Sequence, residues 1–92
     1  MPILFSVGTI CLSRRALGIL GGAGIHPLEL IKRHESGDWG ALSAEEQAEN
    51  TRALQDGRHG IVSLYSFATA LDLWIVTETD RRRTRILLSD EW

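Results

Sequence analysis

The fold of this chain is decided by residues 61–88, which read IVSLYSFATALDLWIVTETDRRRTRILL. Apolar and polar side chains alternate with a period of two over residues 61–67 and again over residues 71–78, and a third strand-forming run follows at residues 84–88. This period is typical of strands that bury one face, and short polar links between such runs favour antiparallel neighbours. We therefore predict a three-stranded antiparallel meander.

Two short helices are predicted ahead of the meander. Ser13 is an acceptable N-cap for a helix over residues 14–20, and closely spaced glycines then end that helix, one of them in the left-handed conformation. Pro27 suits the first turn of the second helix, because proline lacks the N–H that would be unpaired there, and Gly37 ends this helix. The glycines that end the first helix are Gly21, Gly22 and Gly24.

A third helix is predicted from a capping box. Ser43 and Glu46 have the spacing at which the hydroxyl accepts from one backbone N–H while the carboxylate accepts from another. The helix then runs over residues 44–54 and ends at Gly57. The stretch 35–56 holds six acidic residues against one basic residue, so most sides of this helix are expected to face solvent. Its expected core positions are Ala44, Ala48 and Leu54.

The remaining segments complete an α+β prediction. Residues 3–7 are a short apolar run with Gly8 behind it and are predicted as a strand, which residues 9–12 either extend or leave. The links at residues 68–70 and 80–83 are predicted as a turn and a polar corner. Helices followed by hairpins imply that two or three short N-terminal helices pack on one face of a small antiparallel β-meander of three to four strands.

The length and net charge of the chain exclude some classes of function. A chain of 92 residues is expected to form a single compact domain over residues 1–92. Ten Lys and Arg residues against twelve Asp and Glu residues give a net charge of −2, which excludes a uniformly basic nucleic-acid-binding protein. Cys11 is the sole cysteine and has no intrachain disulfide partner, so a reducing compartment fits. No apolar run approaches the ~20 residues that cross a bilayer, and we expect a cytoplasmic protein.

The sequence gives no motif for a cofactor or a metal. The glycines of residues 18–24 lack the strand–turn–helix order of a dinucleotide site and the GK[ST] of a phosphate-binding loop. His34 and Asp38 have the spacing of metal ligands on a helix, but Gly37 lies between them and interrupts it. We therefore expect no cofactor and no metal. His34 is interpreted as a residue near a helix C-terminus, where the helix dipole favours its charged form.

Four arginines within five positions mark the polar corner before the last strand. One hypothesis makes them a clamp for phosphate or carboxylate groups, because guanidinium forms bidentate contacts, and this would allow direct contact with nucleic acid. The alternative is a solvated turn whose arginines pair with Glu78, Asp80 or the acidic third helix. The members of this arginine corner are Arg81, Arg82, Arg83 and Arg85.

A second set of residues suggests RNA cleavage as an alternative function. Glu78 would take the proton of a 2′-hydroxyl, His59 would protonate the leaving oxygen, and Arg58 and Arg81 would stabilise the phosphorane. Tyr65 belongs to the same predicted meander. This hypothesis requires that the side chains share a site. The alternation, however, places Tyr65 and Glu78 on opposite faces of the predicted sheet.

Three tryptophans are informative in a chain with few aromatic residues. Trp74 lies in mid-strand and is predicted to be in or near the core. Trp39 lies in the turn Gly-Asp-Trp-Gly and Trp92 at the last position, where each either caps the helical layer or serves as an exposed anchor for a partner.

The chain resembles a family of short plasmid-related proteins carried by plasmids, integrative elements and phages. The most specific segments of the resemblance are GDWG at residues 37–40 and the WI-x-TE-x-DR pattern at residues 74–81, with weaker agreement over most of the chain. Gly57 and Arg58 depart from the family's glycine–arginine spacing, and Trp92 stands where a tyrosine is expected. The resemblance implies a role in maintenance, in transfer, or in evasion of restriction or CRISPR defence. Further matching residues are Gly8, Ser13, Ala23, Gly24, Pro27, Arg33, His34, Leu42, Asn50, Ser63, Tyr65, Thr84, Ile86, Leu87, Leu88 and Glu91.

We therefore expect a mobile-element accessory protein that acts without catalysis by binding a macromolecule. A protein or ribonucleoprotein partner is expected, and an inhibitor of host defence would be one such protein. The alternatives are a ribonuclease-like enzyme and a structural subunit that forms a homodimer through Trp74 and the meander edge. The expected contact residues are Arg81, Arg82, Arg83, Arg85, Asp38, Trp39, Glu45, Glu46 and Glu49.

Overall fold

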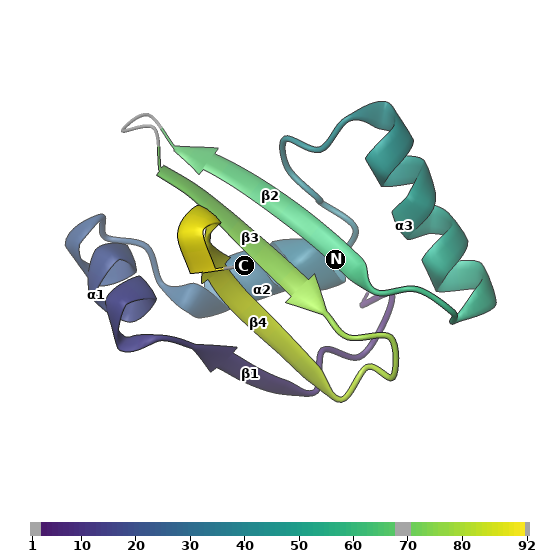
Figure 1. Ribbon diagram of the computed structural model, residues 1–92, viewed down its shortest axis with the longest axis horizontal. Coiled ribbons are helices and arrows are strands. Elements are labelled where there is room, and N and C mark those ends of the chain that lie inside the picture. Colours follow the sequence, from purple (N-terminus) through teal and green to yellow (C-terminus); the bar gives the residue numbers. More distant parts are fainter. Residues whose placement is uncertain (1–2, 68–70, 92) are drawn as a thin grey trace.

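The computed structural model describes residues 3–67 and 71–91, so the predicted turn at residues 68–70 and Trp92 lie outside the described residues. The predicted α+β fold is confirmed: helices from the first half of the chain pack on strands from the second half (Figure 1). In chain order the elements are β1 (Thr9–Leu12), α1 (Arg14–Gly22), α2 (Pro27–Glu35), α3 (Ala44–Asp56), β2 (Ile61–Phe67), β3 (Leu71–Thr77), β4 (Arg83–Leu88) and the 3-10 turn η1 (Ser89–Glu91).

The sheet has four strands in the order β1-β4-β3-β2. Strands β2, β3 and β4 form the predicted antiparallel meander, in which Ser63, Ile75 and Ile86 stand side by side. Strand β1 joins the free edge of β4 in the parallel direction, with Ile10 beside Thr84. The meander is therefore confirmed, and the fourth strand makes the sheet mixed rather than wholly antiparallel.

The prediction of a strand over residues 3–7 was wrong, because the first strand begins at Thr9. Gly8 has a φ of 63°, and a Cβ at this position would lie 2.2 Å from the carbonyl oxygen of Arg82. Glycine permits this close approach, which lets the Thr9 N–H donate to the same oxygen at 2.9 Å. Upstream of Gly8 the chain runs along the end of α2, where the Leu4 N–H donates to the last carbonyl of that helix at 2.8 Å.

The three helices begin where the sequence predicts. The Ser13 hydroxyl accepts from the Ala16 N–H at the start of α1, and Pro27 occupies the first turn of α2. The capping box of α3 is complete in both directions, between Ser43 and Glu46. Helix α1 continues through Gly21 and Gly22, two residues past its predicted end. The left-handed glycines that follow the helices are Gly24, Gly37 and Gly57.

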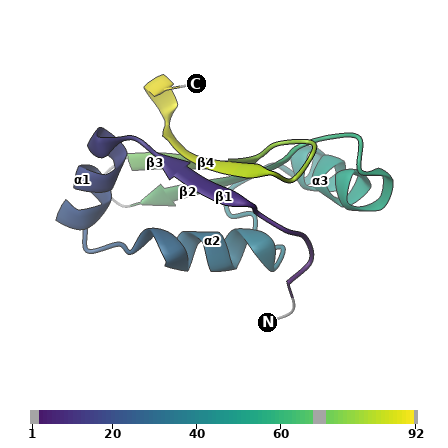
Figure 2. The same ribbon diagram turned by 90° about the horizontal axis from the view of Figure 1, so that it is seen from below.

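Helix α3 lies beside the edge of the sheet rather than on its face (Figures 1 and 2). Its buried residues are Asn50 and Ala53, whereas Ala44 and Ala48 are exposed, so the predicted core positions on this helix were wrong in those two cases. An edge contact needs few buried positions, which explains why the sequence of α3 is so polar. Among the described residues, no helix is both long enough and apolar enough to span a membrane.

Within residues 3–67 and 71–91, a helix layer covers one face of the sheet. Figure 2 shows α2 beneath the sheet, α1 and α3 at its two ends, and η1 rising from the opposite face. The main core lies between α1, α2 and the covered face, and a second core cluster fills the corner between α3 and the start of β2. The main core contains Ala16, Leu20, Leu30, Ile31, Tyr65, Leu73, Ile75, Ile86 and Leu88. The second contains Trp39, Leu42, Ala53 and Ile61.

A chain of hydrogen bonds centred on His34 crosses the covered face. The Nε2 atom of His34 lies 2.9 Å from Thr77 Oγ1, which lies 2.6 Å from Thr84 Oγ1, and the Thr84 hydroxyl donates to the Val7 carbonyl oxygen at 2.7 Å. Because Thr84 uses its hydrogen on Val7, Thr77 donates to Thr84 and His34 Nε2 carries the proton. On the other side of the ring, the Ser63 hydroxyl then donates to Nδ1.

This network makes His34 neutral, which corrects the interpretation of a charged histidine at a helix C-terminus. The side chain is fully buried, and the Phe5 ring packs edge-on against it with ring centroids 5.1 Å apart. Burial lowers the pKa of His34 to about 4, because desolvation penalises the imidazolium. The loss of hydration therefore outweighs the favourable effect of the helix dipole.

Candidate functional site

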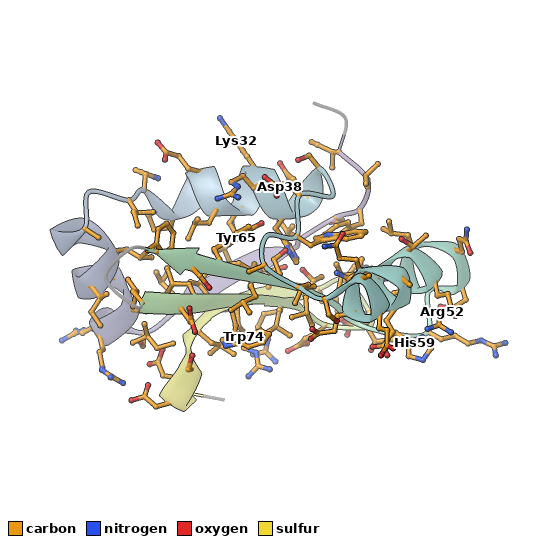
Figure 3. All side chains as sticks on the ribbon, turned by 90° about the horizontal axis from the view of Figure 1, so that it is seen from above. Lys32, Asp38, Arg52, His59, Tyr65 and Trp74 are labelled. Atoms are coloured by element: carbon orange, nitrogen blue, oxygen red, sulfur yellow. The ribbon has the colours of Figure 1, made fainter. Side chains whose placement is uncertain are left out.

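The face of the sheet opposite α2 carries a row of apolar side chains, all of them half-buried. Strand register places Leu64, Trp74 and Leu87 side by side, with Val62 and Val76 paired in the next row. Figure 3 shows Trp74 pointing away from α2, whereas Tyr65 on the neighbouring strand points towards it. We call these five residues the uncovered apolar row: Val62, Leu64, Trp74, Val76 and Leu87.

A groove of about 570 Å³ opens where α3 meets this face. This volume is within the range of pockets that hold small ligands or inserted side chains. Val62 and Trp74 supply its apolar floor, and Glu46 and Glu49 stand on the wall that α3 provides. The full lining consists of Leu42, Glu46, Glu49, Asn50, Arg52, His59, Gly60, Val62 and Trp74.

The position of α3 beside the sheet is fixed by Asn50. Its side-chain amide donates to the Val62 carbonyl oxygen at 2.7 Å, and its side-chain oxygen accepts from the Val62 N–H at 3.1 Å. Asn50 therefore satisfies the free edge of β2 as a neighbouring strand would. Further along this edge, Gly40 forms a parallel bridge with Leu64, and a Cβ on Gly40 would lie 2.1 Å from the Leu64 carbonyl oxygen.

Charges of opposite sign flank the uncovered apolar row. The α3 side is acidic, with exposed Glu45, Glu46 and Glu49, and its basic residue Arg52 lies toward the C-terminal end of the helix. On the β4 side, Arg85 stands beside Val76 across the ladder and is exposed. The near-neutral total charge of the chain therefore combines two surfaces of opposite sign.

Arg81 has a structural role within the arginine corner. Its guanidinium donates to backbone carbonyl oxygens of Ala53 at 3.1 Å and His59 at 2.8 Å, as well as to those of Glu78 and Thr79. These bonds tie the β3–β4 turn to the end of α3. Arg81 also has a positive φ of 63°, which a non-glycine residue seldom adopts. Its guanidinium is therefore engaged within the domain.

The other arginines of the corner differ from one another. Arg83 Nε lies 2.9 Å from Glu78 Oε1, so this exposed pair agrees with the solvated-turn alternative. Arg82 and Arg85 are exposed, and the described residues provide no ion pair for either side chain. The four arginines are equivalent in the sequence, whereas among the described residues only the side chains of Arg82 and Arg85 have neither an ion pair nor a hydrogen bond.

Of the residues of the ribonuclease alternative, Tyr65 is separated from the others, whereas the Arg81 guanidinium donates to the backbone carbonyl oxygens of His59 and Glu78. Tyr65 is buried on the covered face, where its hydroxyl donates to the Asp38 carbonyl oxygen at 2.6 Å, and burial raises its pKa to about 12. Glu78 follows Thr77, which pairs with Ile61, so it lies at the opposite end of the β2–β3 ladder from Tyr65. The carboxylate of Glu78 is paired with Arg83, and Arg81 is bound to backbone carbonyls. Arg58 is exposed, and its backbone N–H donates to Asp56.

The predicted contact residues Asp38 and Trp39 do not line the groove. Asp38 is on the α2 side, where its carboxylate accepts from Arg33 at 2.8 Å, and this hydrogen bond lowers the pKa of Asp38. The Arg33 guanidinium in turn lies 4.3 Å from the centroid of the Tyr65 ring. Trp39 is only 8% exposed and belongs to the second core cluster, which agrees with its interpretation as a packing residue.

Sequence reasoning missed most of the uncovered apolar row. Glu46 and Glu49 were predicted as contact residues, but Val62, Leu64, Val76 and Leu87 were not. The available signal was the second phase of the alternation, because the residues expected to face solvent are mostly apolar over residues 61–67 and 71–78. Apolar residues on both phases are typical of sheets whose two faces are both covered.

Comparisons with known proteins provide no relative from which a function could be inferred for this chain. A scan against family models, a search of curated proteins and a search of solved structures each gave no significant match to the chain. Within the described residues, no three histidine, cysteine, aspartate or glutamate side chains converge as a metal site would require.

Proposed function

We propose that this protein is a binding module that docks on a partner protein through the uncovered face of its sheet. The observation that carries the proposal is the uncovered apolar row, which lies between an acidic helix and exposed arginines. A sheet normally buries both apolar faces against other layers, and here the described part of the chain supplies a helix layer for one face only. A partner would supply the missing layer.

The chemistry of this face is that of a protein interface. Interfaces have an apolar centre and a polar rim, and tryptophan and arginine are enriched among the residues that dominate binding energy. Trp74 lies near the middle of the face, and Arg85 and the glutamates of α3 stand at its margins. Opposite charges on the two rims would orient the partner and suppress wrong pairings.

The class of partner follows from the resemblance to plasmid-related proteins. On that basis we propose a mobile-element accessory protein without catalytic activity, whose partner belongs to the machinery of element transfer or of host defence. An inhibitor of a restriction or CRISPR complex is one form of this proposal. A homodimer that buries Trp74 against a second copy is the competing form.

The test is affinity purification of the tagged protein from its source cells, with quantitative mass spectrometry of the recovered proteins. Trp74→Ala and Arg85→Glu should each reduce the specific partner at least tenfold. Leu28→Ala is the matched control, because Leu28 is 50% exposed on α2, on the other side of the molecule. Sedimentation at several concentrations examines the homodimer separately. Recovery of the same partners at unchanged levels by both uncovered-face variants would overturn the proposal.

A further inference from the structure

The groove beside α3 combines three features that together specify a ligand chemistry. Its floor is apolar and includes the indole of Trp74, and its α3 wall carries the two carboxylates of Glu46 and Glu49. Glu46 and Glu49 are three positions apart on one helix, so their side chains are neighbours on its surface. A flat aromatic ring beside paired carboxylates suits a guanidinium group, which stacks on the ring and forms bidentate hydrogen bonds with carboxylates.

The polar groups of the groove divide into engaged and available ones. The amide of Asn50 donates one hydrogen bond to the backbone of Val62 and accepts one from it. Glu46 accepts from the Ser43 N–H through Oε1, which holds its carboxylate in place and leaves Oε2 for another donor. No ion pair engages Glu49 among the described residues. Glu46 therefore offers an acceptor at the end of the groove farther from Arg52, which lines the same groove three positions after Glu49.

The basic groups of the groove lie toward the C-terminal end of α3. Arg52 follows Glu49 along the helix, and His59 faces the Asp56 carboxylate with Nδ1 and Oδ1 3.6 Å apart. Figure 3 shows Arg52 and His59 near the end of α3, away from the α2 side where Lys32 and Asp38 lie. The groove is thus polarised along α3. A cation is favoured at the Glu46–Glu49 end and disfavoured at the other.

We infer that the groove receives an arginine side chain from the partner protein. The stem of that arginine would lie on Val62 and Trp74, and its guanidinium would lie against Glu46 and Glu49. This inference rests on the proposed binding function and names the chemistry of one contact within it. It also assigns the Glu46 carboxylate a role beyond the capping box of α3.

The probe for this inference is N-acetyl-arginine methylamide, and its neutral isostere N-acetyl-citrulline methylamide is the control ligand. Binding is followed by NMR through the indole N–H of Trp74 and the backbone N–H of Gly60. The arginine probe should shift both signals saturably at millimolar concentrations. The citrulline probe should bind at least about fivefold more weakly, because it lacks the charge.

Matched variants locate the contact. The double variant Glu46→Gln with Glu49→Gln should weaken the arginine probe about fivefold or more, and glutamine at position 46 keeps the capping box. Glu45→Gln is the control, because Glu45 is on the same helix but outside the groove lining. Equal binding of the two probes, or unchanged binding in the double variant, would overturn the inference. A partner that depends on Trp74 but not on the two glutamates would remove the inference and leave the proposed function standing.

Discussion

The two faces of the sheet differ in how completely the domain uses its own side chains. On the covered face, Leu73, Ile75 and Ile86 are fully buried, and the polar side chains of Ser63, Thr77 and Thr84 are hydrogen-bonded through or beside His34. On the uncovered face the apolar residues are only half-buried. From this difference in burial we expect the first face to contribute more to folding stability, and the proposed partner would bury the second.

The largest expected difference between the faces is in the cost of removing a leucine side chain. Leu88 is 4% exposed on the covered face, and its neighbour Leu87 is half-buried on the uncovered face. Leu88→Ala should lower the free energy of unfolding by about 2–5 kcal/mol, and Leu87→Ala by no more than about half as much. Urea titration measures both variants. Equal losses would show that the uncovered face is as important for folding as the covered one.

The covered face should also give the domain a pH-dependent stability. The pKa of His34 is about 4 in the folded chain against an ordinary 6.5, so below pH 6.5 the unfolded chain binds the proton first. Stability is therefore complete above pH 6.5 and falls as the pH approaches 4, by about 3 kcal/mol in total. Unfolding experiments between pH 7 and 4 measure this slope.

His59→Gln is the control for this pH dependence, because His59 is exposed near the groove. This variant should keep the slope, whereas His34→Gln should lose most of it and be less stable at neutral pH. If His34→Gln fails to fold, the titration of His34 followed by NMR in the unsubstituted protein gives the same answer. An apparent pKa near 6.5 would contradict the buried neutral imidazole.

A smaller difference is expected within the arginine corner. Arg81→Lys removes a planar group that donates to several backbone carbonyls and should cost about 1–2 kcal/mol. Arg82→Lys should leave stability within about 0.5 kcal/mol, because the Arg82 side chain is exposed. Thermal unfolding of the two variants compares them directly. A larger loss of stability in Arg82→Lys than in Arg81→Lys would contradict the structural role assigned to Arg81.

The smallest expected effect comes from α1, at the end of the sheet. A Cβ on Gly21 would meet no atom within 4 Å, so Gly21→Ala should raise stability by about 0.5–1 kcal/mol through helix propensity. Gly24→Ala should lower stability instead, because Gly24 has a φ of 72°. Parallel urea titrations of the two variants test this pair. A loss of stability in Gly21→Ala would mean that the open side of α1 packs on something within the domain.

Local signals predicted the helix starts and the meander well. The Ser13 cap and the Ser43–Glu46 box depend on hydrogen bonds within four residues, so sequence spacing is enough to recognise them. The candidate site was predicted only in part: Glu46 and Glu49 line the groove, but Asp38 and Trp39 do not. Their positions depend on where α3 and the preceding loop pack, and sequence spacing does not encode that.

The sequence by itself determined the alternation of the strands, the starts of the helices and the chemistry available on each segment, because these depend on neighbouring residues. Only the tertiary structure decided which phase of the alternation α2 covers, that β1 pairs in parallel with β4, and that Arg81 binds backbone carbonyls. It also decided that His34 is neutral. Each of these outcomes depends on contacts between residues far apart in the chain, where desolvation and close packing outweigh local preference.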